Sequence, residues 1–129
     1  MCIRDRSCAV RAIPQPHQAA RIEFRVPSAD SNPYLALTAC LAAGLTGLEN
    51  KIEPPPPTEG DAYLQKVESA LRFPRNLLEA TDRFRGSRRA RGMFGDAFVE
   101  WYCHTREWED NVFRAHVSDL EVRRYFESV

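Results

Sequence analysis

The stretch from Tyr34 to Leu48 constrains the fold more than any other part of the chain. Asn32 before it is a good helix N-cap and Pro33 a good first helical residue, so we predict a helix from Pro33 to about Glu49. Apolar side chains cover nearly every face of this helix, which predicts that it is buried on most sides. The stretch falls short of the roughly 20 apolar residues that a membrane span needs. We therefore expect burial inside a protein and no membrane partner.

Two strands precede this helix. Residues Cys8–Ile13 alternate weakly and predict a short strand, and residues Gln18–Val26 predict a second one, so the two can pair as a hairpin. Side chains alternate across a strand, which gives the second strand a charged face and an apolar face. The apolar face is expected to hold the strand to a core. The charged face comprises Arg21, Glu23 and Arg25, and the apolar face Ile22, Phe24 and Val26.

The rest of the chain is predicted to be mostly helical. The expected fold class is therefore α+β, with a short two-stranded antiparallel sheet followed by a mostly helical region. Asn76 and Ser118 are candidate N-caps, Glu121 completes a capping box with Ser118, and Gly95 should end a helix. The expected helices are Asp61–Leu71, Leu77–Phe84, Arg88–Phe94, Asp96 to about Val117, and a short one after Ser118.

An aromatic stripe marks the helix that begins at Asp96. Its members recur at spacings of three and four residues, which is typical of one helix face. We interpret the stripe as core or as an oligomer contact rather than as a cofactor site. It consists of Phe98, Trp101, Tyr102, Thr105, Trp108, Val112 and Phe113.

The chain has no net charge that would recruit a nucleic acid. Among its 129 residues, 18 basic and 18 acidic side chains cancel, so no overall field attracts DNA, RNA or an anionic membrane. A group of arginines leaves a basic helical nucleic-acid binder as an alternative. The acidic neighbours Glu79, Asp82 and Asp96 favour instead a solvated helix face or a subunit contact. The arginines are Arg83, Arg85, Arg88, Arg89 and Arg91.

The cysteines argue against a zinc site. None of the four forms a CxxC pair, and no spacing of Cys and His suits zinc. This cysteine usage is typical of a reduced compartment, and the first residues lack the apolar core of a signal peptide. We therefore expect a cytoplasmic protein.

The charged face of the second strand offers the most chemistry. A carboxylate such as Glu23 suits a hard metal ion, whereas guanidinium groups suit a phosphate or a substrate carboxylate. The alternation by itself favours a plainer interpretation, in which Glu23 makes an ion pair with Arg21 or Arg25. Both interpretations stay open on the pattern alone.

Several segments resemble the C-terminal part of the catalytic domain of glutamine synthetase. The most specific are Arg-Ile-Glu-Phe-Arg at 21–25 and Asn-Pro-Tyr-Leu-Ala at 32–36. Residues 1–6 resemble translated adaptor sequence, so we expect them to be a non-native leader. Residues 7–129 are then expected to be the C-terminal part of such a domain, truncated at its N-terminal side. The resemblance implies that the strand pair is a short antiparallel edge of the larger glutamine synthetase catalytic sheet. Weaker support comes from Ala42–Leu45, Asn50–Ile52, Phe98–Glu100, Arg106–Glu109 and Ser118–Glu127.

The resemblance implies an ATP-dependent ligase. Members of the family phosphorylate the γ-carboxylate of glutamate with ATP, and ammonia then displaces the phosphate. Divalent ions, Mg²⁺ or Mn²⁺, neutralise the developing charge, as phosphoryl transfer requires. The implied partners are glutamate, ATP and ammonia or another amine, and the parent protein is implied to be a homo-oligomer of stacked rings.

The motif also assigns roles to individual residues. Glu23 is implied to be a metal ligand, Arg25 to bind the carboxylate of glutamate, and Arg21 to contact ATP or phosphate. An upstream segment resembles the family's strand with two catalytic arginines, which match Arg6 and Arg11. Arg6 is implied to act on the glutamate side and Arg11 on the ATP phosphates.

The identity of the amine stays open. Ammonia would make the parent a glutamine synthetase, and a polyamine or other amine would make it a γ-glutamylamide synthetase. A non-catalytic helical assembly module that keeps the strand motif only as structure is a further alternative. The family's other metal ligands cannot be placed in this chain, so we expect no ligase activity from it alone. Tyr63 lies near a tyrosine that some members adenylylate, but the residues after it differ, and we interpret it as a packing residue.

Overall fold

The protein is described here by a computed structural model that covers residues 7–15, 19–126 and 128. Its elements are the antiparallel strand pair β1–β2 followed by helices, which confirms the predicted α+β class. The chain divides into two compact units, Met1–Glu68 and Ser69–Val129, which are described separately below.

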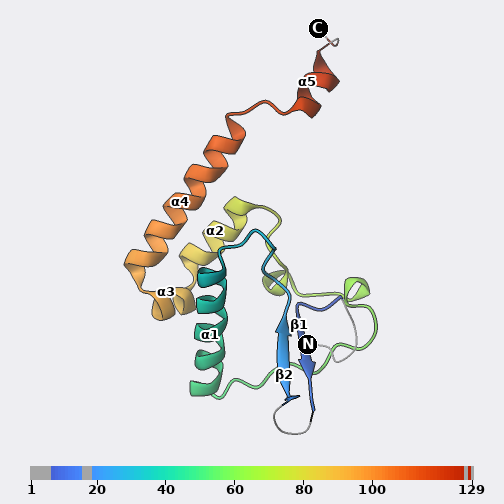
Figure 1. Ribbon diagram of the computed structural model, residues 1–129, viewed down its shortest axis with the longest axis vertical. Helices are drawn as coiled ribbons and strands as arrows, with labels where there is room; N and C mark the ends of the chain where they lie inside the picture. Colours follow the sequence, from blue (N-terminus) through green and yellow to red (C-terminus); the bar gives the residue numbers. More distant parts are fainter. Residues whose placement is uncertain (1–6, 16–18, 127, 129) are drawn as a thin grey trace. The chain divides into compact units, whose positions relative to one another are not determined.

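The first unit contains the strand pair (Figure 1). Strand β1 spans Val10–Ile13 and β2 spans Arg21–Phe24, so both are shorter than predicted. They run antiparallel with Arg11 opposite Glu23 and Ile13 opposite Arg21. One more backbone hydrogen bond, from Arg25 N–H to Ala9 O at 2.9 Å, continues the pairing beyond the strands.

The apolar face of β2 does not contact a core, contrary to prediction. Ile22 is 71% exposed, and Phe24 and Val26 are also exposed. Alternation correctly separates the two faces of a strand, but it does not supply the layer that would cover one of them. Within the described residues, β2 pairs only with β1.

Helix α1 spans Pro33–Glu49, as predicted. The side chain of Asn32 accepts hydrogen bonds from the N–H groups of Tyr34 and Leu35, and Pro33 occupies the first turn. At the other end Lys51 adopts a positive φ of 50°, and Ile52 N–H donates to Gly47 O at 2.9 Å. These local contacts fix both ends of the helix, and Asn32 and Pro33 are the sequence signals that marked its start.

The prediction that α1 is buried on most sides is wrong for this chain. None of its residues is buried, and Leu41 remains 67% exposed. An apolar helix is buried only where other parts of a protein pack against it. The sequence of the helix itself does not provide those partner surfaces. The large exposed side chains are Tyr34, Leu37, Leu41, Leu45 and Leu48.

The helix predicted over Asp61–Leu71 is absent. Two short 3₁₀ turns, η2 at Ala62–Leu64 and η3 at Ser69–Leu71, take its place. Asp61 accepts a hydrogen bond from Tyr63 N–H at 2.9 Å and caps η2, but the turn ends at Gln65, whose backbone is extended at φ −85° and ψ 142°. Tyr63 is 83% exposed, so its interpretation as a packing residue is also wrong.

The second unit is helical. Helices α2 and α3 begin with the side-chain caps Asn76 and Ser87, and α5 begins with the predicted capping box of Ser118 and Glu121. Gly95, at φ 79° and ψ 153°, separates α3 from α4 in a conformation that favours glycine. The helices are α2 at Leu77–Gly86, α3 at Arg88–Phe94, α4 at Asp96–Arg114 and α5 at Asp119–Tyr125.

The core of this unit is small and lies where α4 packs on α2 and α3. Val99 and Cys103 of α4 are completely buried, Ala90 of α3 is buried beside them, and Phe84 and Phe94 pack against this cluster. The Cys103 thiol donates to Thr81 O at 3.7 Å, and burial raises the pKa of that thiol. Burial and a high pKa describe a structural cysteine rather than a reactive one.

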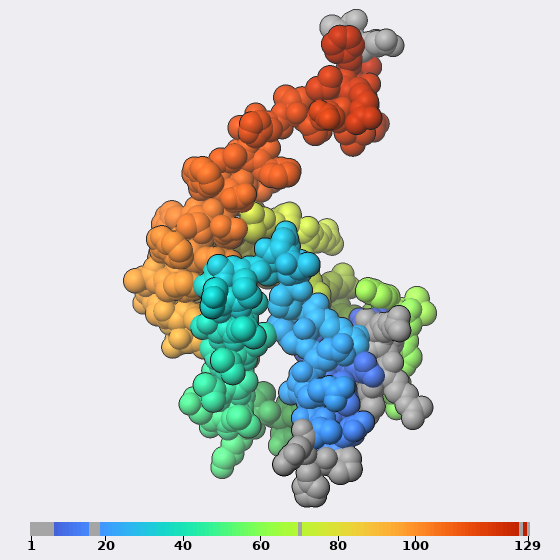
Figure 2. Space-filling view, in the orientation of Figure 1, coloured from blue at the N-terminus to red at the C-terminus, as the bar shows by residue number. Residues whose placement is uncertain are grey.

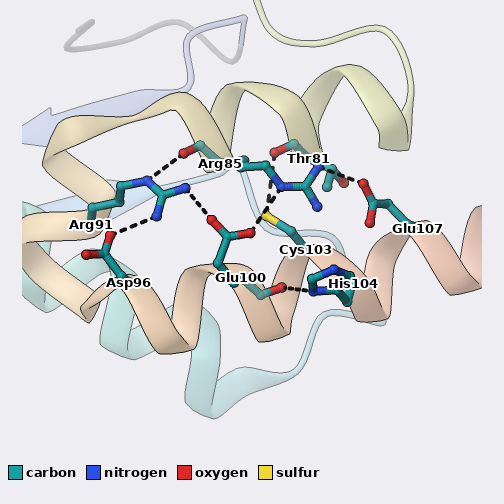
Figure 3. A network of polar contacts seen from close by, with 8 residues as sticks. All are labelled: Thr81, Arg85, Arg91, Asp96, Glu100, Cys103, His104 and Glu107. Atoms are coloured by element: carbon teal, nitrogen blue, oxygen red, sulfur yellow. Dashed lines mark hydrogen bonds and ion pairs between the residues drawn. The ribbon is translucent and has the colours of Figure 1, made fainter.

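A polar network borders the core (Figure 3). Arg85 of α2 contacts Glu107 at 2.7 Å and Glu100 at 3.5 Å, while Arg91 of α3 contacts Asp96 at 2.7 Å. Arg91 also pairs with Glu100 at 2.5 Å. Arg83 of α2 pairs with Glu79 as well. Three arginines of the group singled out in the sequence, Arg83, Arg85 and Arg91, are therefore paired with acidic side chains.

The aromatic stripe of α4 divides between two environments. Phe98 and Tyr102 stack on each other, and Tyr102 also meets Phe84 edge to face. Trp101 and Trp108 are exposed, so the core interpretation fails for them. All residues from 111 to 126 are exposed, and Figure 2 shows this stretch in orange to red. Across the described residues, no helix is long and apolar enough to cross a membrane.

Candidate active-site strand pair

The strand pair brings together three of the predicted site residues. Because Arg11 and Glu23 are register partners, their side chains leave the same face of the pair. The Arg11 Nη1 lies 3.3 Å from Glu23 Oε2, and Arg25 Nη2 lies 2.9 Å from the same oxygen. A single carboxylate oxygen therefore accepts from two guanidinium groups.

This arrangement keeps Glu23 ionised. The hydrogen bond from Arg25 is the main cause that lowers the pKa of Glu23, and the positive charges of Arg25 and Arg11 lower it further, while partial desolvation opposes them. The Glu23 side chain is 45% exposed, so water screens these interactions. The result is an anionic oxygen that solutes can reach.

The other predicted arginines are placed differently. Arg21 Nη1 donates to Ala19 O at 3.3 Å. The carboxylate thus lies between Arg11 and Arg25 rather than between Arg21 and Arg25. Arg6 lies outside the described residues, so its predicted role stays a prediction.

Sequence reasoning missed the contact between Arg11 and Glu23. Alternation within one strand identifies Arg25 as a neighbour of Glu23 two residues away, and that part of the ion-pair interpretation is realised. The partner across the hairpin depends on the register of β1 against β2. The contact could be predicted only from the register of the two strands together. A slip of one residue would turn the Arg11 side chain to the opposite face of the strand pair.

A metal ion of the kind that the family uses fits this site only in part. The Glu23 carboxylate is a suitable oxygen donor for a hard divalent cation. Within residues 7–15, 19–126 and 128, no group of three or more His, Cys, Asp or Glu side chains could enclose a metal. Glu23 can therefore supply one ligand, and the two arginines supply donors for an anion beside it.

The described surface also holds a shallow groove in the helical unit. It has a volume of about 320 Å³, and Leu77, Phe113 and the paired Asp110 and Arg114 are among its lining residues. Its lining is mostly apolar, Asp110 and Arg114 pair with each other, and Glu109 is its third charged lining residue. The groove therefore offers less chemistry than the strand pair.

Comparison with known proteins agrees with the strand motif. Residues 2–125 match the family model described as "Glutamine synthetase, catalytic domain". The chain is 40% identical over 125 residues to a glutamate–isopropylamine ligase from Pseudomonas sp, a match that covers 97% of this chain and 27% of the relative. It is 38% identical over 123 residues to a gamma-glutamylethanolamide synthetase from Streptomyces coelicolor, covering 95% of this chain and 26% of that protein.

Glutamine synthetases themselves are also similar. The chain is 35% identical over 131 residues to the glutamine synthetase of Azotobacter vinelandii, covering 95% of this chain and 28% of the relative. It thus spans between 26% and 28% of the length of these three proteins. A match over nearly the whole chain, together with the charged strand motif, means that the chain belongs to the glutamine synthetase family.

Proposed function

We propose that the parent protein is an ATP-dependent ligase that joins glutamate to ammonia and thereby forms glutamine. In this reaction ATP phosphorylates the γ-carboxylate of glutamate, and the amine then displaces the phosphate. The observation that supports the proposal most is the shared contact of Arg11 and Arg25 with Glu23 on an exposed strand face. That face offers both an oxygen donor for a cation and guanidinium donors for an anion.

Each side chain has a chemical task in this proposal. Glu23 would contribute one carboxylate to the site of a Mg²⁺ or Mn²⁺ ion, which stabilises charge on the transferred phosphate when bound. Arg25 would orient the glutamate carboxylate through paired N–H donors, a task that suits guanidinium better than ammonium. Arg11 and Arg21 would contact the phosphates of ATP, and Arg6 would act with Arg11 at the reacting γ-carboxylate.

An organic amine is a second candidate for the acceptor. One similar protein, at 40% identity, is named a glutamate–isopropylamine ligase, and another, at 38% identity, a gamma-glutamylethanolamide synthetase. Glutamine synthetases occur at comparable identity, with 35% for the Azotobacter vinelandii protein. Similarity alone does not separate the acceptors, so ammonia and organic amines must be compared by assay.

We also propose that the parent is a cytoplasmic homo-oligomer of stacked rings. The exposed apolar side chains at the end of the chain support a subunit contact there, because contiguous exposed apolar surface is typical of protein interfaces. These side chains include Phe113, Val117, Leu120 and Phe126.

A hybrid enzyme tests the proposed ligase activity. The segment of the Pseudomonas glutamate–isopropylamine ligase that matches this chain would be replaced by this chain, and phosphate release would be measured with ATP, glutamate and either ammonia or isopropylamine. We expect glutamate-dependent phosphate release, and the preferred amine identifies the acceptor. A hybrid that assembles like the parent ligase but releases no phosphate with any amine would contradict the proposal.

Two matched variants of the hybrid locate the activity. Arg25→Lys keeps the charge but loses paired donors, so we expect a loss of about 10- to 100-fold in kcat/KM for glutamate. Arg89→Lys is the control, because Arg89 is an exposed arginine on α3. The 129-residue chain by itself should release no phosphate, since its described residues hold no enclosing set of metal ligands.

A further inference from the structure

The contact between Glu23 and two arginines has a chemical implication beyond the role of each residue. Glu23 Oε2 lies 2.9 Å from Arg25 and 3.3 Å from Arg11. The proposed function gives these same groups other partners, a cation for the carboxylate and anions for the guanidinium groups. The carboxylate and an incoming anion therefore compete for the same N–H donors.

The geometry makes this competition direct. Both contacts converge on one oxygen, so withdrawal of that oxygen affects Arg11 and Arg25 together. The side chains remain partly exposed, with 35% for Arg11, 21% for Arg25 and 45% for Glu23, so a dissolved anion can reach the cluster. A carboxylate is a close chemical mimic of the anions that such arginines bind.

We propose that Glu23 acts as an internal counter-ion of Arg11 and Arg25, which an incoming phosphate or carboxylate group must displace from their N–H donors. This proposal rests on the proposed function, and it adds a competition between Glu23 and the anions that the two arginines bind. Because Glu23 and the anion need the same N–H donors, the Glu23 carboxylate lowers the affinity of the two guanidinium groups for phosphate or for a substrate carboxylate.

The competition can be tested without catalysis and without metal. Glu23→Gln removes the negative charge while keeping the length of the side chain. In the 129-residue chain, we expect this variant to bind inorganic phosphate at least about fivefold more tightly than the unchanged chain, the Coulomb effect of one nearby charge in water. The dissociation constant would be measured by NMR titration of the guanidinium resonances in metal-free buffer.

Glu79→Gln is the matched control. Glu79 accepts from Arg83 at 2.6 Å, so this variant changes the net charge by the same amount and also releases an arginine from an acidic partner. Its phosphate affinity should equal that of the unchanged chain. Equal gains in both variants would mean a general charge effect and would overturn the proposal, as would no gain in Glu23→Gln.

A second measurement needs no substitution. As phosphate binds to the unchanged chain, the ¹³C carboxylate resonance of Glu23 should move together with the guanidinium resonances of Arg11 and Arg25. Phosphate that binds to the arginines while Glu23 does not respond would refute direct competition. If phosphate binds neither the unchanged chain nor the Glu23→Gln variant, the proposal is refuted as well.

These measurements separate this proposal from the ligase proposal. An inactive hybrid enzyme combined with tighter phosphate binding by Glu23→Gln would remove the ligase assignment and keep the counter-ion role. An active hybrid combined with unchanged phosphate binding would keep the ligase and remove the counter-ion role.

Discussion

At the scale of single residues, Lys51 has the most unusual backbone among the described non-glycine residues. Its φ of 50° lies in the left-handed region just after α1. That conformation closes the helix end, because it lets Ile52 N–H reach Gly47 O at 2.9 Å. An L-amino acid adopts it at a cost of roughly 1–2 kcal/mol, which glycine avoids.

We therefore expect Lys51→Gly to stabilise the end of α1 by about 1 kcal/mol. Amide hydrogen exchange of Ile52 reports on this directly and should slow by about fivefold. Lys51→Ala is the control, because alanine keeps the Cβ atom that causes the cost. Faster exchange in the glycine variant would contradict the proposed strain.

The site also illustrates which residue-level contacts a sequence reveals. The neighbour relation between Glu23 and Arg25 follows from alternation in one strand, and the structure has that contact. The contact with Arg11 needs the register between strands, which short strands specify weakly from sequence. Arg21 was predicted to flank the same carboxylate, but it donates instead to Ala19 O.

At the scale of elements, the contact between α2 and α4 depends on charged groups that border a small core. Hydrogen bonding to Arg85 is the main cause that lowers the pKa of Glu107, and hydrogen bonding to Arg91 is the main cause for Glu100. A carboxylate whose folded-state pKa is lowered stabilises the fold above its unfolded pKa. That contribution is lost as pH falls through the lowered folded value.

We accordingly predict that acid weakens the helical unit through these carboxylates. The free energy of unfolding should fall below about pH 4.5, and Glu107→Gln should make this pH dependence shallower. Both tryptophans, Trp101 and Trp108, lie in α4, so their fluorescence during urea unfolding reports on this unit. Glu109→Gln on the same helix is the control and should leave the slope unchanged.

The ends of elements were more predictable than their surroundings. Asn32, Asn76 and Gly95 are local signals, and each marks the helix end expected of it. The segment after Asp61 was wrongly predicted as a helix, because the turn that Asp61 caps ends at Gln65, whose backbone is extended. Burial was predicted least well, since Leu41 and Trp108 depend on partner surfaces that their own helices do not contain.

At the scale of the whole molecule, the large exposed apolar surface is the feature that most affects whether the chain associates with other chains. The buried cluster contains only Ala90, Val99 and Cys103 among the described residues, whereas many large apolar side chains face solvent. Contiguous apolar surface of this kind marks sites of association. The chain spans 27% of the length of its Pseudomonas relative, and this exposed apolar surface supports the proposed ring assembly of the parent protein.

The isolated chain should therefore self-associate, and α1 should contribute strongly. Replacing Leu41 and Leu48 by glutamine removes two of its exposed apolar side chains, which should lower the average mass in sedimentation at a given concentration. The double change Glu49→Gln and Glu53→Gln is a control that leaves the apolar face intact. An average mass that is unaffected by the leucine changes would mean that association does not involve α1.

The side-chain caps have a consequence for the order of events during folding. Asn32, Asn76, Ser87 and Ser118 each satisfy the first turn of the helix that follows them, using only residues a few positions away. Helix formation of this local kind takes about 0.1–1 μs, whereas docking of subunits takes milliseconds to minutes. The starting point of each capped helix, and with it the face that the helix presents, can thus be settled long before a partner arrives.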